Sequence, residues 1–238
     1  MSGYAPGGDP DDRPLWFTPP AGEDRRRRLL TRERVVAEAL AVISTDGVEA
    51  LSMRALATRL GVVPGALYRH VRSKEQLQDL VLDGVLAEVD CQVDDSLGWA
   101  RHVGTLAQRL RSVLEDHPGV AALLKARDPL SPHSLALAEA FLAALRAAEL
   151  PDHQTALAFR LVYDYTLGFA LSDRTSAGEQ RIQDTATRAE LAAFLRSLPA
   201  DRFPVLTTLG EHVWVADRDQ RFGASLNTLI NGLHAERP

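Results

Sequence analysis

The sequence predicts an all-α protein, with a three-helix N-terminal domain of the helix-turn-helix kind and a larger helical bundle behind it. Apolar residues recur at helical spacing from Thr31 almost to the end of the chain, and no run alternates apolar and polar residues as a half-buried strand would. Glycines and prolines divide this periodic stretch into segments of ordinary helical length. Both observations favour an all-helical fold.

The first three helices are marked by their end signals. Thr31 is a plausible N-cap, and Val35, Ala39, Val42 and Ile43 recur on one face of the helix that follows. Gly47 has the position of a C-terminal glycine. A second helix starts at Ser52 and closes at Gly61, and Pro64 suits the first turn of a third.

A fourth helix begins at a capping-box pattern, Ser73 with Gln76, and carries an apolar stripe that runs to Leu86. Beyond Gly98 the same periodicity predicts six more helices, punctuated by prolines. Their expected ranges are 99–116, 119–127, 133–149, 152–173, 185–197 and 219–235.

The composition is that of an ordinary globular protein. Of the 238 residues, 45% are apolar and 25% are charged. No uncharged apolar run approaches the length of a membrane-spanning helix, and the N-terminus lacks a signal-peptide pattern. The single cysteine, Cys91, leaves no intrachain disulfide and no cysteine-rich metal site. We therefore expect a cytoplasmic protein without membrane contact.

Charge is distributed unevenly along the chain. The net charge of −5 by itself argues against nucleic-acid binding. Residues 25–76, however, hold 11 basic and five acidic side chains, a net +6, so the remainder carries −11. A basic module on an acidic body is expected where only one end of a protein meets phosphate.

Residues 1–24 contain four glycines and five prolines without an apolar period, so we expect a disordered N-terminal arm. The basic run Arg25–Arg28 follows it. That run could track DNA phosphates or enter the minor groove, and it could equally be a solvated tail.

Residues 52–72 fit a helix-turn-helix. Two short helices pack around a turn at 61–63, the second with Leu67 and Val71 facing inward. That orientation turns four residues outward, where base edges and phosphates would be met, and leaves His70 at the flank. The outward residues are Pro64, Gly65, Tyr68 and Arg69. A chance pair of short helices would show the same spacing, so the spacing alone does not decide.

The stretch GVEALSMRALATRLGVVPGALYRHVRSKEQL resembles the N-terminal module of TetR-type repressors, whose pattern reads A-x-x-L-G-V followed by L-Y-x-H-[VF]-x-[SN]-K-x-x-L. The resemblance covers roughly residues 31–80 and implies a DNA-binding domain over 25–76 that contacts double-stranded DNA. Arg54 and Arg69 are the best candidates for guanine, since small residues occupy the other base-reading positions. The implied DNA contacts are Ser52, Arg54, Pro64, Gly65, Ala66, Tyr68, Arg69, His70 and Lys74.

The C-terminal segment RFGASLNTLINGLHAE is similar to the ending of the tetracycline-repressor branch of that family. This similarity implies that the last helix and the helix around 157–171 form a four-helix bundle between two subunits. The helix at 157–171 is apolar around most of its circumference, which also favours a dimer partner. Arg160 and Asp164 on it could form an ion pair at the interface or contact a ligand. The expected apolar anchors are Leu226, Leu229, Ile230 and Leu233.

Residues 77–238 are expected to be a ligand-binding and dimerisation domain. Four residues share a face of the helix at 99–116, and they are either part of a ligand pocket or ordinary core with a snorkelling arginine. Aromatic residues elsewhere could line the same cavity. The candidate pocket residues are Trp99, His102, Leu106, Arg109, Phe141 and Tyr163.

No catalytic, metal or cofactor site is expected. The seven histidines show no metal-ligand spacing, and no nucleophile elbow or phosphate-cradling glycine loop is present. In the tetracycline-repressor branch a histidine of the sixth helix helps hold a drug-bound metal ion, and residues 119–129 contain none. A small organic effector without a bridging metal is therefore expected.

The sequence thus favours a homodimeric bacterial repressor that leaves a near-palindromic operator on the nucleoid when a small-molecule effector binds. One alternative is a regulator with a vestigial sensor domain that responds to a protein partner. The other is an all-α enzyme in which the helix-turn-helix serves only packing.

Overall fold

The computed structural model describes residues 30–92, 96, 98–127, 130–175, 185–214 and 217–235, and every regular element in these ranges is helical. The predicted arm at 1–24 and the Arg25–Arg28 run lie outside the described residues. The elements are α2 (Arg32–Asp46), η2 (Val48–Ala50), α3 (Met53–Leu60), α4 (Pro64–Leu67), α5 (Lys74–Leu86), α6 (Trp99–Asp116), α7 (Val120–Arg127), α8 (Pro132–Arg146), α9 (Asp152–Thr175), α11 (Thr185–Arg196), α12 (Pro204–Trp214) and α13 (Arg218–Ala235).

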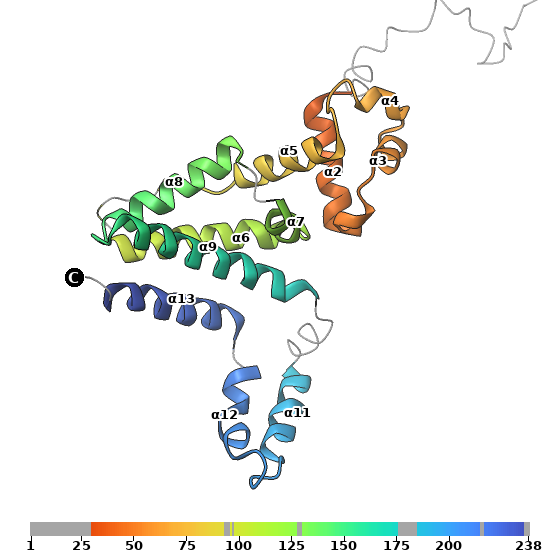
Figure 1. The fold of residues 1–238 in the computed structure, drawn as a ribbon. Helices are drawn as coiled ribbons and strands as arrows, with labels where there is room; N and C mark the ends of the chain where they lie inside the picture. Colours follow the sequence, from red (N-terminus) through yellow and green to blue (C-terminus); the bar gives the residue numbers. More distant parts are fainter. Residues whose placement is uncertain are drawn as a thin grey trace, which may run out of the picture.

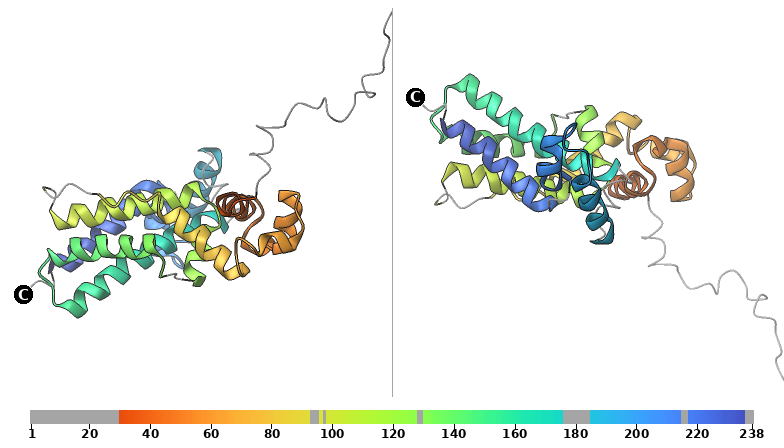
Figure 2. Two further views of the ribbon diagram at one scale, coloured as in Figure 1. Left: turned by 90° about the horizontal axis from the view of Figure 1, so that it is seen from above. Right: turned by 90° about the horizontal axis from the view of Figure 1, so that it is seen from below.

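Three parts follow one another along the molecule. A module of α2, α3 and α4 lies at one end, and α5 runs from it into a bundle of α6, α8, α9 and α13 (Figure 1). The views from above and below show the module at the tip of an elongated molecule (Figure 2). The α11–α12 hairpin projects away from the bundle, and its two helices pack chiefly on each other.

One continuous apolar core joins the module to the bundle. It runs from Val35 in α2 through Leu82 in α5 and Leu106 in α6 to Leu233 in α13. Because α5 contributes to both ends of this core, a displacement of α5 in the bundle would be transmitted to the module.

The predicted N-caps are confirmed. Thr31 Oγ1 accepts a hydrogen bond from Arg34 N at 3.2 Å, and the hydroxyls of Ser52 and Ser73 do the same three residues on, each at 3.1 Å. The expected capping box at Ser73 is only half present. The Gln76 side chain accepts from Arg72 N at 2.6 Å, one residue earlier than a capping box requires.

Among the α-helices of the described ranges, one was not predicted. Helix α12 begins at Pro204, in a stretch that is rich in β-branched residues and has low helix propensity. Tertiary packing supports it, because α12 lies closely against α11: a Cβ at Gly210 would sit 3.2–3.3 Å from the Leu195 side chain. The eighth helix also ends at Arg146 rather than at the expected residue 149, since Glu149 adopts a left-handed φ of 60°.

Gly119 lies at the contact between the bundle and the module. Its φ is +84°, and a Cβ there would sit 2.9 Å from the Ile43 carbonyl oxygen and 3.1 Å from Ile43 Cγ2. Ile43 belongs to α2, so this glycine allows the turn before α7 to approach the backbone of the module.

Replacing Gly119 with alanine should therefore lower the free energy of unfolding by about 1–3 kcal/mol, from backbone strain and the clash with Ile43. Urea denaturation followed by circular dichroism measures the change. The matched control is Gly84→Ala in α5, where nothing lies within 4 Å, and it should be neutral or stabilise by about 0.5–1 kcal/mol. Equal stability of the two variants would argue against the close contact.

Candidate functional site

The turn between α3 and α4 is sharply defined. Gly61 ends α3 in the left-handed conformation, with φ 68° and ψ 33°, and Val62 N donates to the Ala57 carbonyl at 3.0 Å. Val63 is extended, and Pro64 occupies the first turn of α4. The predicted roles of Gly61 and Pro64 are confirmed.

The second helix of the motif is short. After Leu67 the chain continues in turns, with His70 N bonded to the Leu67 carbonyl at 2.8 Å and Val71 N to the same oxygen at 3.0 Å. Leu67 and Val71 are both buried, as predicted, and they anchor this segment against α3 and the rest of the module.

The residues predicted to face outward do so. Pro64, Gly65 and Arg69 are exposed and Tyr68 is 53% exposed, while Ala66 and His70 are half-buried. At the start of α3, Ser52 and Arg54 are exposed, and Lys74 is half-buried in the first turn of α5. Contact of these residues with DNA remains a prediction.

Val63 was missed by the sequence reasoning. It is 69% exposed and lies immediately before Pro64, whereas Val62 packs against the core. Two adjacent valines follow Gly61, and the apolar pattern alone cannot tell which of them faces solvent. An exposed valine on this turn is suited to contact a thymine methyl group.

Two sets of polar contacts fix the module. Arg59 on α3 donates to Glu38 at 2.6 Å and to Asp46 at 3.3 Å, both on α2. Arg32 Nε donates to the His70 carbonyl at 3.3 Å, which connects α2 to the turns that follow α4. The Arg59 charge is thus neutralised within the module, which leaves the arginines at positions 54 and 69 as the better cations for DNA.

Three acidic residues on or just after α5 each contact an arginine or histidine of a later helix or its end. These contacts join α5 to α7, to the start of α8 and to the end of α6. The pairs are Asp79–Arg127 at 2.7 Å, Asp83–His133 at 3.1 Å and Glu88–His117 at 2.9 Å.

Asp83 has the most elaborate environment of the three. Besides the His133 ring, its carboxylate accepts the His133 backbone N–H at 2.9 Å. Burial acts to raise the pKa of Asp83, but hydrogen bonds from the His133 backbone, the Ser131 hydroxyl and the His133 ring hold that pKa below its ordinary value. The contact is therefore made by a charged carboxylate at neutral pH.

The candidate pocket residues divide into two groups. Leu106 and Phe141 are fully buried, and Tyr163 and Trp99 are at most 9% exposed. Phe141 and Tyr163 both pack on Phe159, with ring centroids 6.0 and 5.6 Å apart. Phe141, half-buried Phe159 and Tyr163 thus form an aromatic cluster between α8 and α9.

The other group consists of Arg109 and His102, which are both half-buried. Arg109 Nη1 donates to the carbonyls of Asp90 and Gln92 at 2.7 and 2.6 Å and pairs with the Asp90 carboxylate at 3.1 Å. Arg109 therefore anchors the segment after α5 to α6. Its assignment to a ligand pocket is revised for that reason.

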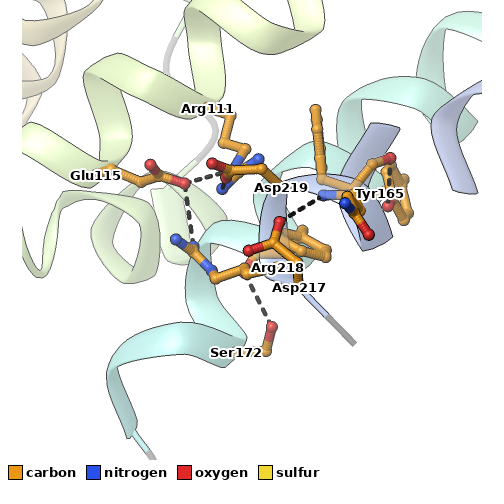
Figure 3. A network of polar contacts seen from close by, with 10 residues as sticks. Arg111, Glu115, Tyr165, Ser172, Asp217, Arg218 and Asp219 are labelled. Atoms are coloured by element: carbon orange, nitrogen blue, oxygen red, sulfur yellow. Dashed lines mark hydrogen bonds and ion pairs between the residues drawn. The ribbon is translucent and has the colours of Figure 1, made fainter. Parts of the chain in front are cut away.

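An arginine and aromatic network holds α13 to α6 and α9 (Figure 3). Arg111 of α6 is 7% exposed, pairs with Glu115 and Asp219, and lies over the Phe169 and Phe222 rings at 5.1 and 4.7 Å. Arg218 pairs with Glu115 at 3.0 Å. Because these charges neutralise one another, the network is structural.

The expected dimer anchors require correction. Leu226, Ile230 and Leu233 are only 2%, 4% and 8% exposed within a single chain, and Leu229 is half-buried. Helix α13 turns Leu226, Ile230 and Leu233 toward its own bundle, because α13 packs on α6 and α9 of the same protomer. These three are core residues and cannot also form the surface that meets a partner, whereas half-buried Leu229 stays a predicted anchor.

A different apolar surface is exposed on α9. Leu157 is 66% and Leu161 is 44% exposed. Arg160 and Asp164 on this helix form an exposed pair at 2.9 Å within α9. Because this pair lies within one helix, an ion pair at a dimer interface and a ligand contact both remain predictions.

No helix in the described ranges is long and apolar enough to cross a bilayer. Among the same residues, no group of three or more histidine, cysteine, aspartate or glutamate side chains could hold a metal ion.

Two family models match the chain. The model for bacterial regulatory proteins of the tetR family matches residues 35–80, and the model for the tetracyclin repressor-like C-terminal domain matches residues 94–237. Together they match most of the module, the first half of α5 and the bundle, with residues 81–93 between the two matches.

Among curated proteins, the chain is 37% identical over 193 residues to an HTH-type transcriptional regulator of Saccharopolyspora erythraea, covering 81% of this chain and 79% of the relative. It is 29% identical to the HTH-type transcriptional repressor DrrR1 of Streptomyces coeruleorubidus, covering 92% and 83%.

Solved structures of the same architecture include ActR of Streptomyces coelicolor. The apo form has a TM-score of 0.76 at 33% identity, covering 87% of this chain and 95% of ActR. The complex of ActR with actinorhodin has a TM-score of 0.74 at 33% identity, covering 87% and 98%. BioQ bound to its double-stranded DNA operator has a TM-score of 0.61 at 27% identity, covering 87% and 100%.

Proposed function

Because the chain belongs to the TetR family of bacterial regulatory proteins and is a transcriptional regulator rather than an enzyme, we propose that it acts as a homodimeric repressor which a small organic ligand releases from its operator. The observation that carries this proposal is the exposed surface of α3 and α4. Buried Leu67 and Val71 fix it, while Tyr68 and Arg69 project from it.

Operator binding needs two such surfaces. In a symmetric dimer they would lie about one DNA turn apart, roughly 34–36 Å, and would read a near-palindromic site. The structural relative BioQ has been solved with its operator, which supports this mode of binding. A chain that acts on a chromosomal operator would work in the bacterial cytoplasm.

The dimer would form through the outer faces of α9 and α13. Exposed Leu157 and Leu161 supply the apolar area on α9. Gly168 on α9 and Ala224 on α13, both exposed, would let helices approach closely. A partner could also cover the apolar surface of the α11–α12 hairpin, where four large side chains are 49–63% exposed. They are Phe194, Val205, Leu209 and Val213.

The ligand would enter the bundle beside the aromatic cluster of Phe141, Phe159 and Tyr163. The complex of ActR with actinorhodin supports an organic ligand for this chain. The cluster is packed in this conformation, so a ligand would have to displace helices. That displacement would reach α5 through Asp79 and Asp83, which contact α7 and α8.

The test is a measurement of linkage. Aromatic compounds that raise the melting temperature, actinorhodin first among them, should weaken binding to a selected operator fragment by about 5- to 150-fold, and DNA should weaken ligand binding equally. Fluorescence anisotropy and calorimetry measure the two sides. If stabilising compounds leave operator affinity unchanged, the sensor does not act on DNA and the vestigial alternative is favoured.

A double variant tests whether α5 couples the ligand site to DNA binding. Asp79→Asn together with Asp83→Asn should keep ligand binding and bring the linkage factor toward one, because the charged contacts of α5 with Arg127 and His133 are lost. Glu139→Gln on the exposed side of α8 is the matched control and should keep the full factor. Wild-type linkage in the double variant would exclude these contacts as the route.

A further inference from the structure

A groove of about 410 Å³ opens between the first half of α6 and the second half of α13. Its floor is formed by Ala100, Gly104 and Ile230, of which Ile230 is 4% exposed. The volume lies in the usual range of small-molecule sites. Neither the DNA-binding surface nor the aromatic cluster contributes to it. The polar wall residues are Arg101, Thr105, Gln108, Asn227 and Asn231.

The wall residues form two facing rows. Arg101, Thr105 and Gln108 are four and three residues apart on α6, and Asn227 and Asn231 are four apart on α13, so each row follows one helix face. The Thr105 hydroxyl donates to the Arg101 carbonyl at 2.9 Å, which leaves its oxygen able to accept. The three amides can each donate and accept hydrogen bonds.

The lining of the groove carries one positive charge. Of the lining residues that the structure describes, Arg101 alone carries a charge. Within α6 and α13 the nearest acidic residues are Glu115, seven residues beyond Gln108, and Asp219, eight residues before Asn227. At the helical rise, Glu115 and Asp219 lie about 10 Å or more along the axes from the groove. In the sequence outside the two helices, Asp95 precedes Ala100 by five residues and Glu236 follows Asn231 by five.

The sequence of both helices departs from helix preference at this groove. Gly104 in the middle of α6 and Asn227 and Asn231 in α13 are poorer helix formers than alanine. Close packing does not require the glycine, because a Cβ there would meet only Ile230 Cδ1, at 3.9 Å. Departures from local preference concentrate at functional sites.

We propose that this groove binds a small polyhydroxylated monocarboxylate. Arg101 would pair with the carboxylate, as arginine does through charge-assisted hydrogen bonds. Thr105 and the amides of Gln108, Asn227 and Asn231 would bond the hydroxyl groups, and the carbon skeleton would lie over Gly104 and Ile230. This groove is separate from the proposed site of the ligand that releases DNA, and the proposal does not depend on that ligand.

The test uses sodium gluconate with the full-length protein at low ionic strength, followed by calorimetry. Gluconate should bind with saturation at one molecule per chain, and sorbitol, which has a similar skeleton without the carboxylate, should bind at least tenfold more weakly. In an amide-selective NMR spectrum, gluconate should shift the side-chain signals of Asn227 and Asn231. No saturable binding of gluconate, or equal binding of sorbitol, would overturn the proposal.

Three variants locate the site. Arg101→Gln should weaken gluconate binding at least tenfold, and Gly104→Leu should abolish it by filling the groove. Lys125→Gln, which removes an exposed charge on α7, should change nothing. The proposal fails if Arg101→Gln binds gluconate like the wild type. It also fails if the wild type binds none and Gly104→Leu turns a dimer into monomers, since the groove is then an interface between copies.

Discussion

Arg69→Ala is expected to weaken binding to the selected operator by about 5- to 150-fold, which corresponds to the loss of one bidentate arginine–guanine contact. Arg69 is exposed beside Tyr68, just after α4, and no carboxylate in the described part of the chain pairs with it. Pro64, Gly65 and Ala66 offer no side-chain hydrogen bond to a base. Most of the direct readout therefore depends on this arginine and on Arg54.

Arg69→Ala and Lys74→Ala should weaken DNA binding in different ways. Loss of a base contact relaxes preference at one operator position, whereas Lys74→Ala should weaken all sequences alike and flatten the salt dependence by about one unit. Anisotropy titrations at several salt concentrations, on the operator and on single-base variants, separate the two effects.

Arg146→Ala is the control, because this arginine is 79% exposed on α8, far from the module in sequence. It should leave operator binding unchanged. Unchanged specificity and affinity for Arg69→Ala would show that the recognition surface has been assigned wrongly.

The module was predictable from the sequence because its signals are local. Hydroxyl N-caps at Thr31 and Ser52 act within three residues, and Gly61 needs only its own left-handed conformation to end α3. The outward residues follow once Leu67 and Val71 are placed in the core. Each of these inferences spans less than two helical turns.

The bundle was less predictable because its contacts join distant segments. The sequence does not reveal that Arg109 bonds to the carbonyl of Gln92, or that Gly210 packs on Leu195 to support α12. Helical spacing indicated which residues of α13 share a face. It could not tell whether that face meets its own bundle or a second chain.

Leu226 and Leu161 distinguish those two possibilities. Leu226 is 2% exposed in one chain, so Leu226→Glu would bury a charge in the core, and we expect a loss of about 3 kcal/mol or more in the free energy of unfolding. Leu161 is 44% exposed within one chain, so Leu161→Glu should cost the fold of the protomer little, and any fall in the urea midpoint should come from weaker dimerisation and depend on protein concentration.

The largest effect is expected when Leu157 and Leu161 are both replaced by glutamate. Two charges would then enter the apolar surface of α9 in each subunit and face each other across the two-fold axis, so sedimentation should show monomers. A monomer reaches one half-site at a time and loses the advantage of simultaneous engagement, which is about 10²- to 10⁴-fold in operator affinity. Leu135→Glu is the matched control, since Leu135 is 52% exposed on α8, outside the proposed interface, and this variant should remain dimeric. An intact dimer in the double variant, with Leu135→Glu monomeric, would move the interface from α9 to α8.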